Sequence, residues 1–211
     1  STQGVSSAAS DVYKRQLADP AKPTEVSRWH MPGQHLAGGE TPTWTRYSHR
    51  LHHALRVGDE MWAAVWQAGF RVIDVSDINK PTTVAEHTYH PMVREPTHKV
   101  LPVPQLINER RIAVVIDEEH AREPGNGQAP ANLWTFDVTD FGNIHGLGSY
   151  HVSEMDSPWS RTPGARFGAH QFQDHLENSL VCCTWFAGGL RPVSYTHLRA
   201  HETRHDLVCR L

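Results

Sequence analysis

The sequence predicts an all-β protein, a fragment of a β-propeller built from four-stranded antiparallel blades. Two observations carry this prediction. Short runs rich in Val, Ile, Trp and Phe are separated by Gly, Pro, Asn and Asp, a composition typical of strands joined by turns. One unit also recurs: "VIDVSDINKPTTVAEHTY" at 72–89 has a counterpart in "TFDVTDFGNIHGLGSYHV" at 135–152. Four short strands in a unit of about 40 residues are typical of a propeller blade.

The repeated unit predicts two complete blades and two partial ones. Each complete blade is expected to run from an inner strand, through two middle strands joined by a turn, to an outer strand. The eight strands are expected near 52–57, 60–66, 70–75 and 82–89, then near 98–103, 110–117, 132–138 and 144–152. A third blade begins at His170 and breaks off at Pro192, and an outer strand near 17–29 is expected from a preceding blade.

Small residues mark the turns of the unit. Short Asp side chains accept hydrogen bonds from backbone N–H groups in turns, so the aspartates between the third and outer strands are predicted to be structural. They are Asp74, Asp77, Asp137 and Asp140. Gly69 and Gly189 predict turns that need a positive φ. Cys182 and Cys183 are neighbours on a strand, so they are expected to be core thiols on opposite faces.

The pattern "GFRVIDVSD" at 69–77, followed by Pro81 and "VAE" at 84–86, resembles the LVIVD-repeat family of predicted β-propellers. The resemblance covers nearly all of residues 17–192 and implies a blade architecture. It implies no particular chemistry, because one fold hosts many functions. Closed propellers need roughly four to eight blades, so the intact protein is expected to be longer than this piece.

The two ends of the chain show neither a strand pattern nor a helix pattern. Residues 6–16 and 193–203 resemble in-frame translations of the two end adapters of a transposase-based sequencing library. We therefore expect residues 1–16 and 193–211 to be translated adapter without a fold, and the propeller fragment to occupy residues 17–192. The alternative is a disordered natural tail at each end.

Charge and motifs narrow the function classes. The ends hold five of the 20 Lys and Arg residues and three of the 23 Asp and Glu residues, so residues 17–192 are more acidic than the net charge of −3 for the whole chain. An acidic fragment gives no support to nucleic-acid binding, and no apolar run is long enough to span a membrane. The sequence contains no phosphate-binding Gly loop, His-Glu-x-x-His or Cys-x-x-Cys motif, and it indicates no localisation.

Histidines are the candidate functional residues, since the chain contains 16 of them. His98, His170 and one of His52 or His53 stand at the start of the expected inner strands. In a propeller this position lies on one face, around the mouth of the central channel. The turn between the second and third strands opens onto the same face, and it should bring Trp66, Trp185, Asp117, Glu118 and Glu119 nearby, with the loop 120–130 and the linker 153–168.

Imidazoles that converge from successive blades can bind Zn, Cu or Fe, and a nearby carboxylate can complete the ligand set. The predicted metal ligands are His52, His53, His98, His170 and Glu118. The alternative is structural, because a histidine at each inner-strand start can also hydrogen-bond between blades. No residue is assigned a catalytic role.

Three functions remain open at this point. The first is a truncated propeller module that binds a metal, a small molecule or a protein partner on its His-rich channel face. The second is a metal-dependent propeller enzyme, for which selenium-binding-protein-like thiol oxidases are a distant analogue in architecture and His content. The third is a structural or adhesion propeller without a site. Missing blades leave strand edges open, so the fragment is also expected to self-associate.

Overall fold

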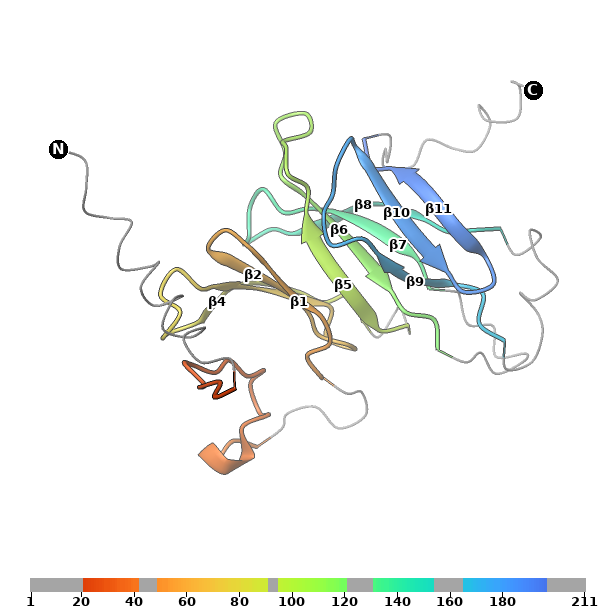
Figure 1. The fold of residues 1–211 in the computed structure, drawn as a ribbon. Helices are drawn as coiled ribbons and strands as arrows, with labels where there is room; N and C mark the ends of the chain where they lie inside the picture. Colours follow the sequence, from red (N-terminus) through yellow and green to blue (C-terminus); the bar gives the residue numbers. More distant parts are fainter. Residues whose placement is uncertain (1–20, 42–48, 91–94, 121–130, 154–164, 197–211) are drawn as a thin grey trace, which may run out of the picture.

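The computed structural model describes residues 21–41, 49–90, 95–120, 131–153 and 165–196. Within them eleven strands form three antiparallel sheets, each built from strands that are consecutive in the sequence (Figure 1). The helical part of these residues is one short 3-10 segment, η1 (Leu36–Gly38). The all-β prediction is therefore confirmed. No helix in the described part has the length and apolarity needed to cross a bilayer.

The first and second sheets are four-stranded meanders. Their strands are β1 (Ala54–Val57), β2 (Glu60–Ala64), β3 (Phe70–Asp74) and β4 (Thr82–His87), then β5 (Thr97–Pro102), β6 (Ile112–Asp117), β7 (Leu133–Asp137) and β8 (His145–Tyr150). Every residue of β5 and β6 is buried. The second sheet lies between the other two, so these strands are covered on both faces, which explains the continuous apolar run of β6.

The third sheet has three strands in the order β11-β10-β9. They are β9 (Ala169–Phe172), β10 (Leu180–Trp185) and β11 (Gly189–Ser194). The first strands of the three sheets, β1, β5 and β9, are called the inner strands here, and β5 contacts both β1 and β9. This contact brings the starts of the three inner strands together.

Two apolar cores hold the sheets against each other. Trp62 and Phe70 of the first sheet pack against Phe136 of the second, with the two Phe ring centroids 5.5 Å apart and edge to face. Between the second and third sheets, Tyr150 meets Trp185 edge to face at 5.5 Å. Aromatic rings of this size bury a large apolar area and favour this geometry. Packing of whole sheet faces therefore fixes where the inner strands begin.

The turn residues have the predicted structural roles. Asp74 Oδ1 accepts the Ser76 N–H at 2.8 Å, and the equivalent Asp137 Oδ1 accepts the Thr139 N–H at 3.0 Å. Asp77 and Asp140 accept the N–H two residues ahead in the same way. Gly69 has a φ of +70° and Gly189 a φ of +82°, a region that favours glycine. Cys183 is buried and Cys182 half-buried, and both are free thiols.

One expected strand is absent. Residues 21–29, the described part of the expected outer strand at 17–29, form no strand. The expected strand would belong to a blade that precedes the first sheet, and the described residues contain no other strand of such a blade with which it could pair. The segment instead contacts that sheet through side chains: the Ser27 hydroxyl donates to the Ile78 carbonyl, and Trp29 Nε1 donates to Thr83 Oγ1 at 3.0 Å.

The expected domain boundary between residues 192 and 193 falls inside β11. This strand continues to Ser194, and Val193 pairs with Val181 of β10. Val193 and Tyr195 are buried, so the expectation of no fold is not met for residues 193–196. Their apolar side chains alternate, which fits the buried face of a hairpin. Residues 1–16 and 197–211 lie outside the described residues.

Candidate metal centre

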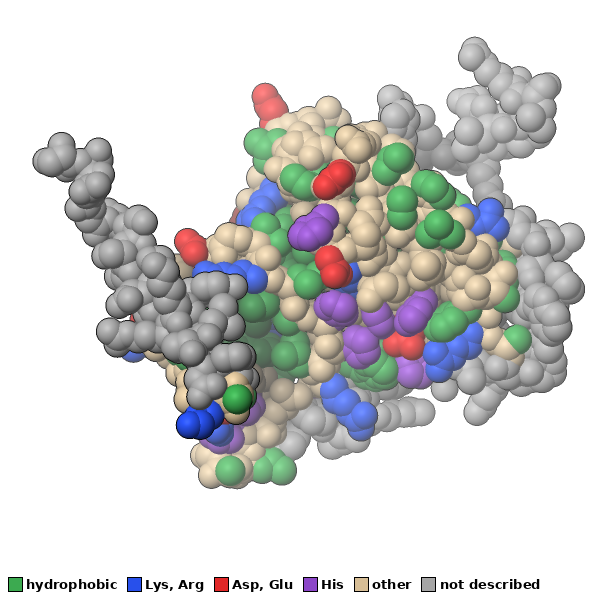
Figure 2. Space-filling view, viewed as in Figure 1, with side chains coloured by type: hydrophobic (Ala, Val, Ile, Leu, Met, Phe, Trp, Pro, Cys, Tyr) green, Lys and Arg blue, Asp and Glu red, His purple; other side chains and the backbone are tan. Residues whose placement is uncertain are grey.

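The predicted histidines stand at the start of the inner strands. His98 is the second residue of β5 and His170 the second residue of β9, while His52 and His53 directly precede β1. Because β5 contacts both β1 and β9, these side chains come together. Figure 2 shows histidine side chains gathered on one face around an acidic side chain, with a basic side chain beside them.

An extra residue interrupts strand pairing at each of these positions. Thr97 and Lys99 pair with consecutive residues of β6, so His98 is left over as a β-bulge. His170 is left over in the same way, between Ala169 and Gln171. In the first sheet, Ala64 exchanges backbone hydrogen bonds with both His52 and His53, at 2.9 and 2.8 Å. Bulges change the direction of a side chain and occur next to functional sites. In all three sheets the histidines therefore stand at the same kind of irregularity.

The histidine rings lie in contact around His98. Its ring centroid is 4.4 Å from that of His52, 4.9 Å from His170 and 6.0 Å from His53. Ligand atoms of His98, Glu118 and His170 lie within 4.8 Å of one another, and so do those of His52, His53 and His98. Two ligands on one metal ion, each about 2 Å from it, lie roughly 3–4 Å apart. Small side-chain adjustments therefore suffice for coordination.

Glu118 supplies the carboxylate of this cluster. It follows β6 directly, and its backbone N–H donates to the Pro96 carbonyl at 2.9 Å, which fixes it beside the start of β5. Its Oε2 lies 3.7 Å from Nε2 of His98 and 3.9 Å from Nε2 of His52. Its Oε1 accepts a hydrogen bond from Arg166 Nη1 at 3.1 Å. One carboxylate thus connects the histidines with the guanidinium of Arg166.

Burial keeps the central histidine neutral. Loss of solvent, together with repulsion from the neighbouring His52 and His170, lowers the pKa of His98 to about 3. Desolvation also lowers the pKa of His53 and of His120. Neutral imidazole is the form that binds metals. At neutral pH His98 therefore offers a lone pair rather than a positive charge.

Aromatic rings flank the cluster on two sides. Trp66 stacks on His52 with centroids 5.1 Å apart, and Phe186 stacks on His170 at 4.6 Å and 17°. His120 meets the Trp66 ring edge to face at 5.0 Å. The expectation for Trp66 agrees with this position. These rings fix the orientation of the two outer imidazoles.

Three other residues expected on this face have structural positions instead. Trp185 is buried in the core between the second and third sheets. Glu119 is buried too, and its Oε2 accepts the backbone N–H groups of Phe167 and Gly168. Asp117 is fully buried and accepts hydrogen bonds from the Tyr89 hydroxyl and from Trp134 Nε1, and its burial raises the pKa to about 7. Glu118 is therefore the carboxylate that faces the histidines.

Sequence reasoning missed Arg166, Phe186 and Lys99. Arg166 lies in the expected linker 153–168, and its motif "ARFG" gave no sign of its partner. Lys99 follows His98 in β5, is 1% exposed, donates to the Phe172 carbonyl at 2.6 Å and pairs with Asp174. An ionisable residue inside an apolar inner strand was the available signal for Lys99. Residues 121–130 and 154–164 of the expected rim segments lie outside the described residues.

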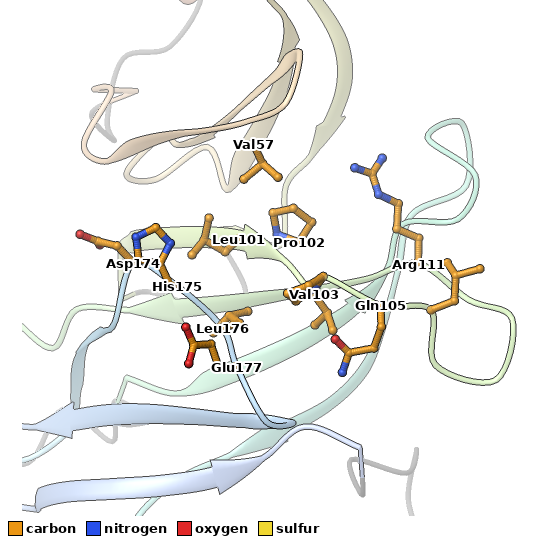
Figure 3. Close-up of a pocket in the computed structure, with 12 residues that line it drawn as sticks. Val57, Leu101, Pro102, Val103, Gln105, Arg111, Asp174, His175, Leu176 and Glu177 are labelled. Carbon is orange, nitrogen blue, oxygen red and sulfur yellow. The ribbon is translucent and has the colours of Figure 1, made fainter.

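A hollow of about 470 Å³ lies at the other end of the inner strands (Figure 3). It is lined by the end of β1 at Val57, the end of β5 at Leu101 and Pro102, and the segment after β9. Two of its charged groups are already paired: Asp174 with Lys99, and Arg111 with Glu60 at 2.9 Å. The hollow therefore offers mainly apolar surface. The histidine cluster, rather than the hollow, is the candidate functional site.

The cluster can hold a cation through neutral nitrogen donors and one carboxylate oxygen, a donor set that suits zinc, copper and iron. Among the described residues, the free thiols Cys182 and Cys183 lie in β10 and are not members of this cluster. No protein-family model, curated protein or solved structure matches this chain. The functional assignment therefore depends on the geometry of the cluster.

Proposed function

We propose that this protein is a propeller-type module that binds a divalent transition metal through His98, Glu118 and His170, with His52 as a fourth ligand. The observation that carries the proposal is the bulge that recurs in β5 and β9 and has a counterpart before β1. At each of these irregularities a histidine faces the same point. Zn²⁺, Cu²⁺ and Fe²⁺ all accept such a set of imidazoles and one carboxylate.

A purely structural role explains these side chains less well. It requires the histidines to hydrogen-bond between the sheets. Nδ1 of His98 is buried and has no hydrogen-bond partner among the described residues. A buried polar atom without a partner costs about 1–3 kcal/mol, whereas coordination or a ligand-induced rotation of the ring would relieve that cost. Metal binding therefore accounts for an otherwise unfavourable atom.

The propeller arrangement and the kinship with LVIVD repeats belong to the same proposal. Their support is the sequential order of strands in each four-stranded sheet and the contact of neighbouring sheets through inner strands. Inner strands of a propeller line a central channel. In that arrangement the histidines surround one mouth of the channel.

Titration of the metal-free full chain with Zn²⁺ and Co²⁺ tests the proposal. We expect one equivalent to bind, with a Co²⁺ visible spectrum of a site with three or four protein ligands. His170→Asn should weaken binding by at least about 100-fold, more than the loss of a supporting residue usually causes. His145→Asn is the matched control, since His145 is exposed on β8 beside Asp137. Equal binding by the two variants would refute the assignment.

His52 separates a closed site from an open one. Structural zinc sites have four protein ligands, whereas catalytic sites have three and leave a position for water or substrate. His52→Asn should weaken binding strongly in a closed site, and it should leave the affinity within a few-fold in an open site. Because the substitution removes the ring that stacks on Trp66, urea unfolding of the metal-free variant, rather than the Trp66 signal, should show that the fold stays intact.

A further inference from the structure

The environment of the cluster indicates what binds beside the metal, and the inference rests on the proposed metal site. We infer that the centre takes an organic carboxylate, with one oxygen on the metal and the other on the guanidinium of Arg166. The acid should carry an apolar or aromatic body.

Arg166 is placed and equipped for this role. Its Nη1 donates to Glu118 Oε1 at 3.1 Å, and its Cζ lies 4.9 Å from the centroid of the Phe186 ring. A guanidinium carries five N–H donors in a planar fork, and the hydrogen bond to Glu118 uses one of them. The side chain is 36% exposed, so an incoming ligand can reach it.

The same contacts put this cation next to the metal ligands. Phe186 contacts the guanidinium and also stacks on His170 at 4.6 Å. Glu118 bonds to Arg166 with one oxygen and faces His98 and His52 with the other. Arg166 therefore borders the cluster through two of the proposed ligands, and an anion on the metal lies within reach of its fork.

Charge favours an anion over a neutral or cationic ligand. Imidazoles that bind a metal are neutral and add no charge. The positive charges of a divalent metal and Arg166 together exceed the negative charges of the two carboxylates Glu118 and Glu119. Lys99 is not an alternative anchor, because it is buried and engaged with the Phe172 carbonyl and Asp174. The planar fork of arginine matches a carboxylate with two parallel hydrogen bonds.

Aromatic rings select the body of the acid. Trp66 and Phe186 stack on different histidines of the cluster, one on His52 and the other on His170. His120 adds an edge-on ring beside Trp66. An aromatic or apolar group gains contact area against such rings. Benzoate should therefore bind more tightly than acetate.

The experiment uses the full chain loaded with Co²⁺, whose visible absorption reports on its ligands. Benzoate is expected to shift this spectrum saturably and acetate to do so more weakly, while neutral benzamide leaves it unchanged. In the Co²⁺-loaded protein Arg166→Gln should raise the Kd for benzoate about tenfold, as the loss of a charge-assisted hydrogen bond does, and this increase should exceed the weakening of Co²⁺ binding that follows from losing the Arg166 contact to Glu118. Arg166→Lys should be intermediate. Arg110→Gln is the control, because Arg110 lies beyond the opposite end of β6.

The outcomes separate the two proposals. If Co²⁺ binds but Arg166→Gln leaves the benzoate affinity unchanged, or if benzamide binds as well as benzoate, the carboxylate inference is overturned and the metal site stands. If Co²⁺ does not bind at the histidines, both proposals fall together. A weaker Kd for Co²⁺ in Arg166→Gln that matches its weaker Kd for benzoate would also count against the inference, since the arginine would then act only by positioning Glu118.

Discussion

His98 should make the metal-free protein sensitive to acid. Burial lowers its pKa to about 3 in the folded chain, whereas an unfolded histidine titrates near 6.5. Between these values the unfolded state binds the proton and the folded state does not. The stabilising contribution of neutral His98 is therefore complete above about pH 6.5, is lost progressively as the pH falls, and is gone at about pH 3.

The size of the effect follows from the same two values. Each pH unit in this window changes the free energy of unfolding by about 1.4 kcal/mol, so a fall to pH 5 costs about 2 kcal/mol. The side chain is 6% exposed, so solvent screening reduces this little. Asp117 opposes it: its pKa is raised to about 7, so its protonation stabilises the folded state as the pH falls below 7. The contribution of His98 is therefore measured by comparing variants, and not from the pH dependence of the total free energy of unfolding.

Urea unfolding at pH 7 and pH 5, with a chelator present, measures the difference. Between the two pH values the wild-type protein should lose about 2 kcal/mol more stability than His98→Gln, which cannot take up this proton. His145→Gln should behave as the wild type, because His145 is exposed at the start of β8, at the opposite edge of the second sheet from β5. The same change with pH in His98→Gln and in the wild type would refute the reasoning.

Two further matched pairs test the packing around the site and the turns. Asp174→Ala should destabilise the protein by about 3 kcal/mol, since it leaves the charge of Lys99 buried without its partner, and Lys99→Met should cost under about 1 kcal/mol. Asp174 itself is 60% exposed, which favours the lower end of that loss, and equal losses in urea unfolding would contradict the account. Gly69→Ala should cost more than about 2 kcal/mol, because its Cβ would lie 2.1 Å from the His87 carbonyl oxygen. Gly58→Ala shares the positive φ but has open space, so about 1 kcal/mol is expected, and equal thermal midpoints would contradict the difference.

The strands were predictable because local signals and the repeat agree. Apolar runs such as that of β6, bounded by turn residues, predicted strands. Asp74 and Asp137 occupy the same place in the repeat, which showed which strand of the first sheet corresponds to which strand of the second. The two ends of the predicted propeller region, residues 17–192, were less predictable. Residues 21–29 resemble part of the repeat but have no strand partner, while β11 extends through Ser194 because hairpin pairing with β10 accepts any suitable alternation.

The residues of the candidate site likewise include some that the repeat predicted and some that it did not. The repeat places His98 and His170 at equivalent positions, so their common face could be deduced from the sequence. The bulges that turn them toward one point leave no local signal, because an extra residue at a strand end looks like ordinary sequence until its partner strand is known. Arg166 belongs to no repeat, and its place depends on Phe186 and Glu118, which lie 20 and 48 residues away along the chain. The proposed metal ligands thus follow from the regular part of the fold, whereas Arg166, which we propose to anchor the carboxylate, comes from a connection outside it.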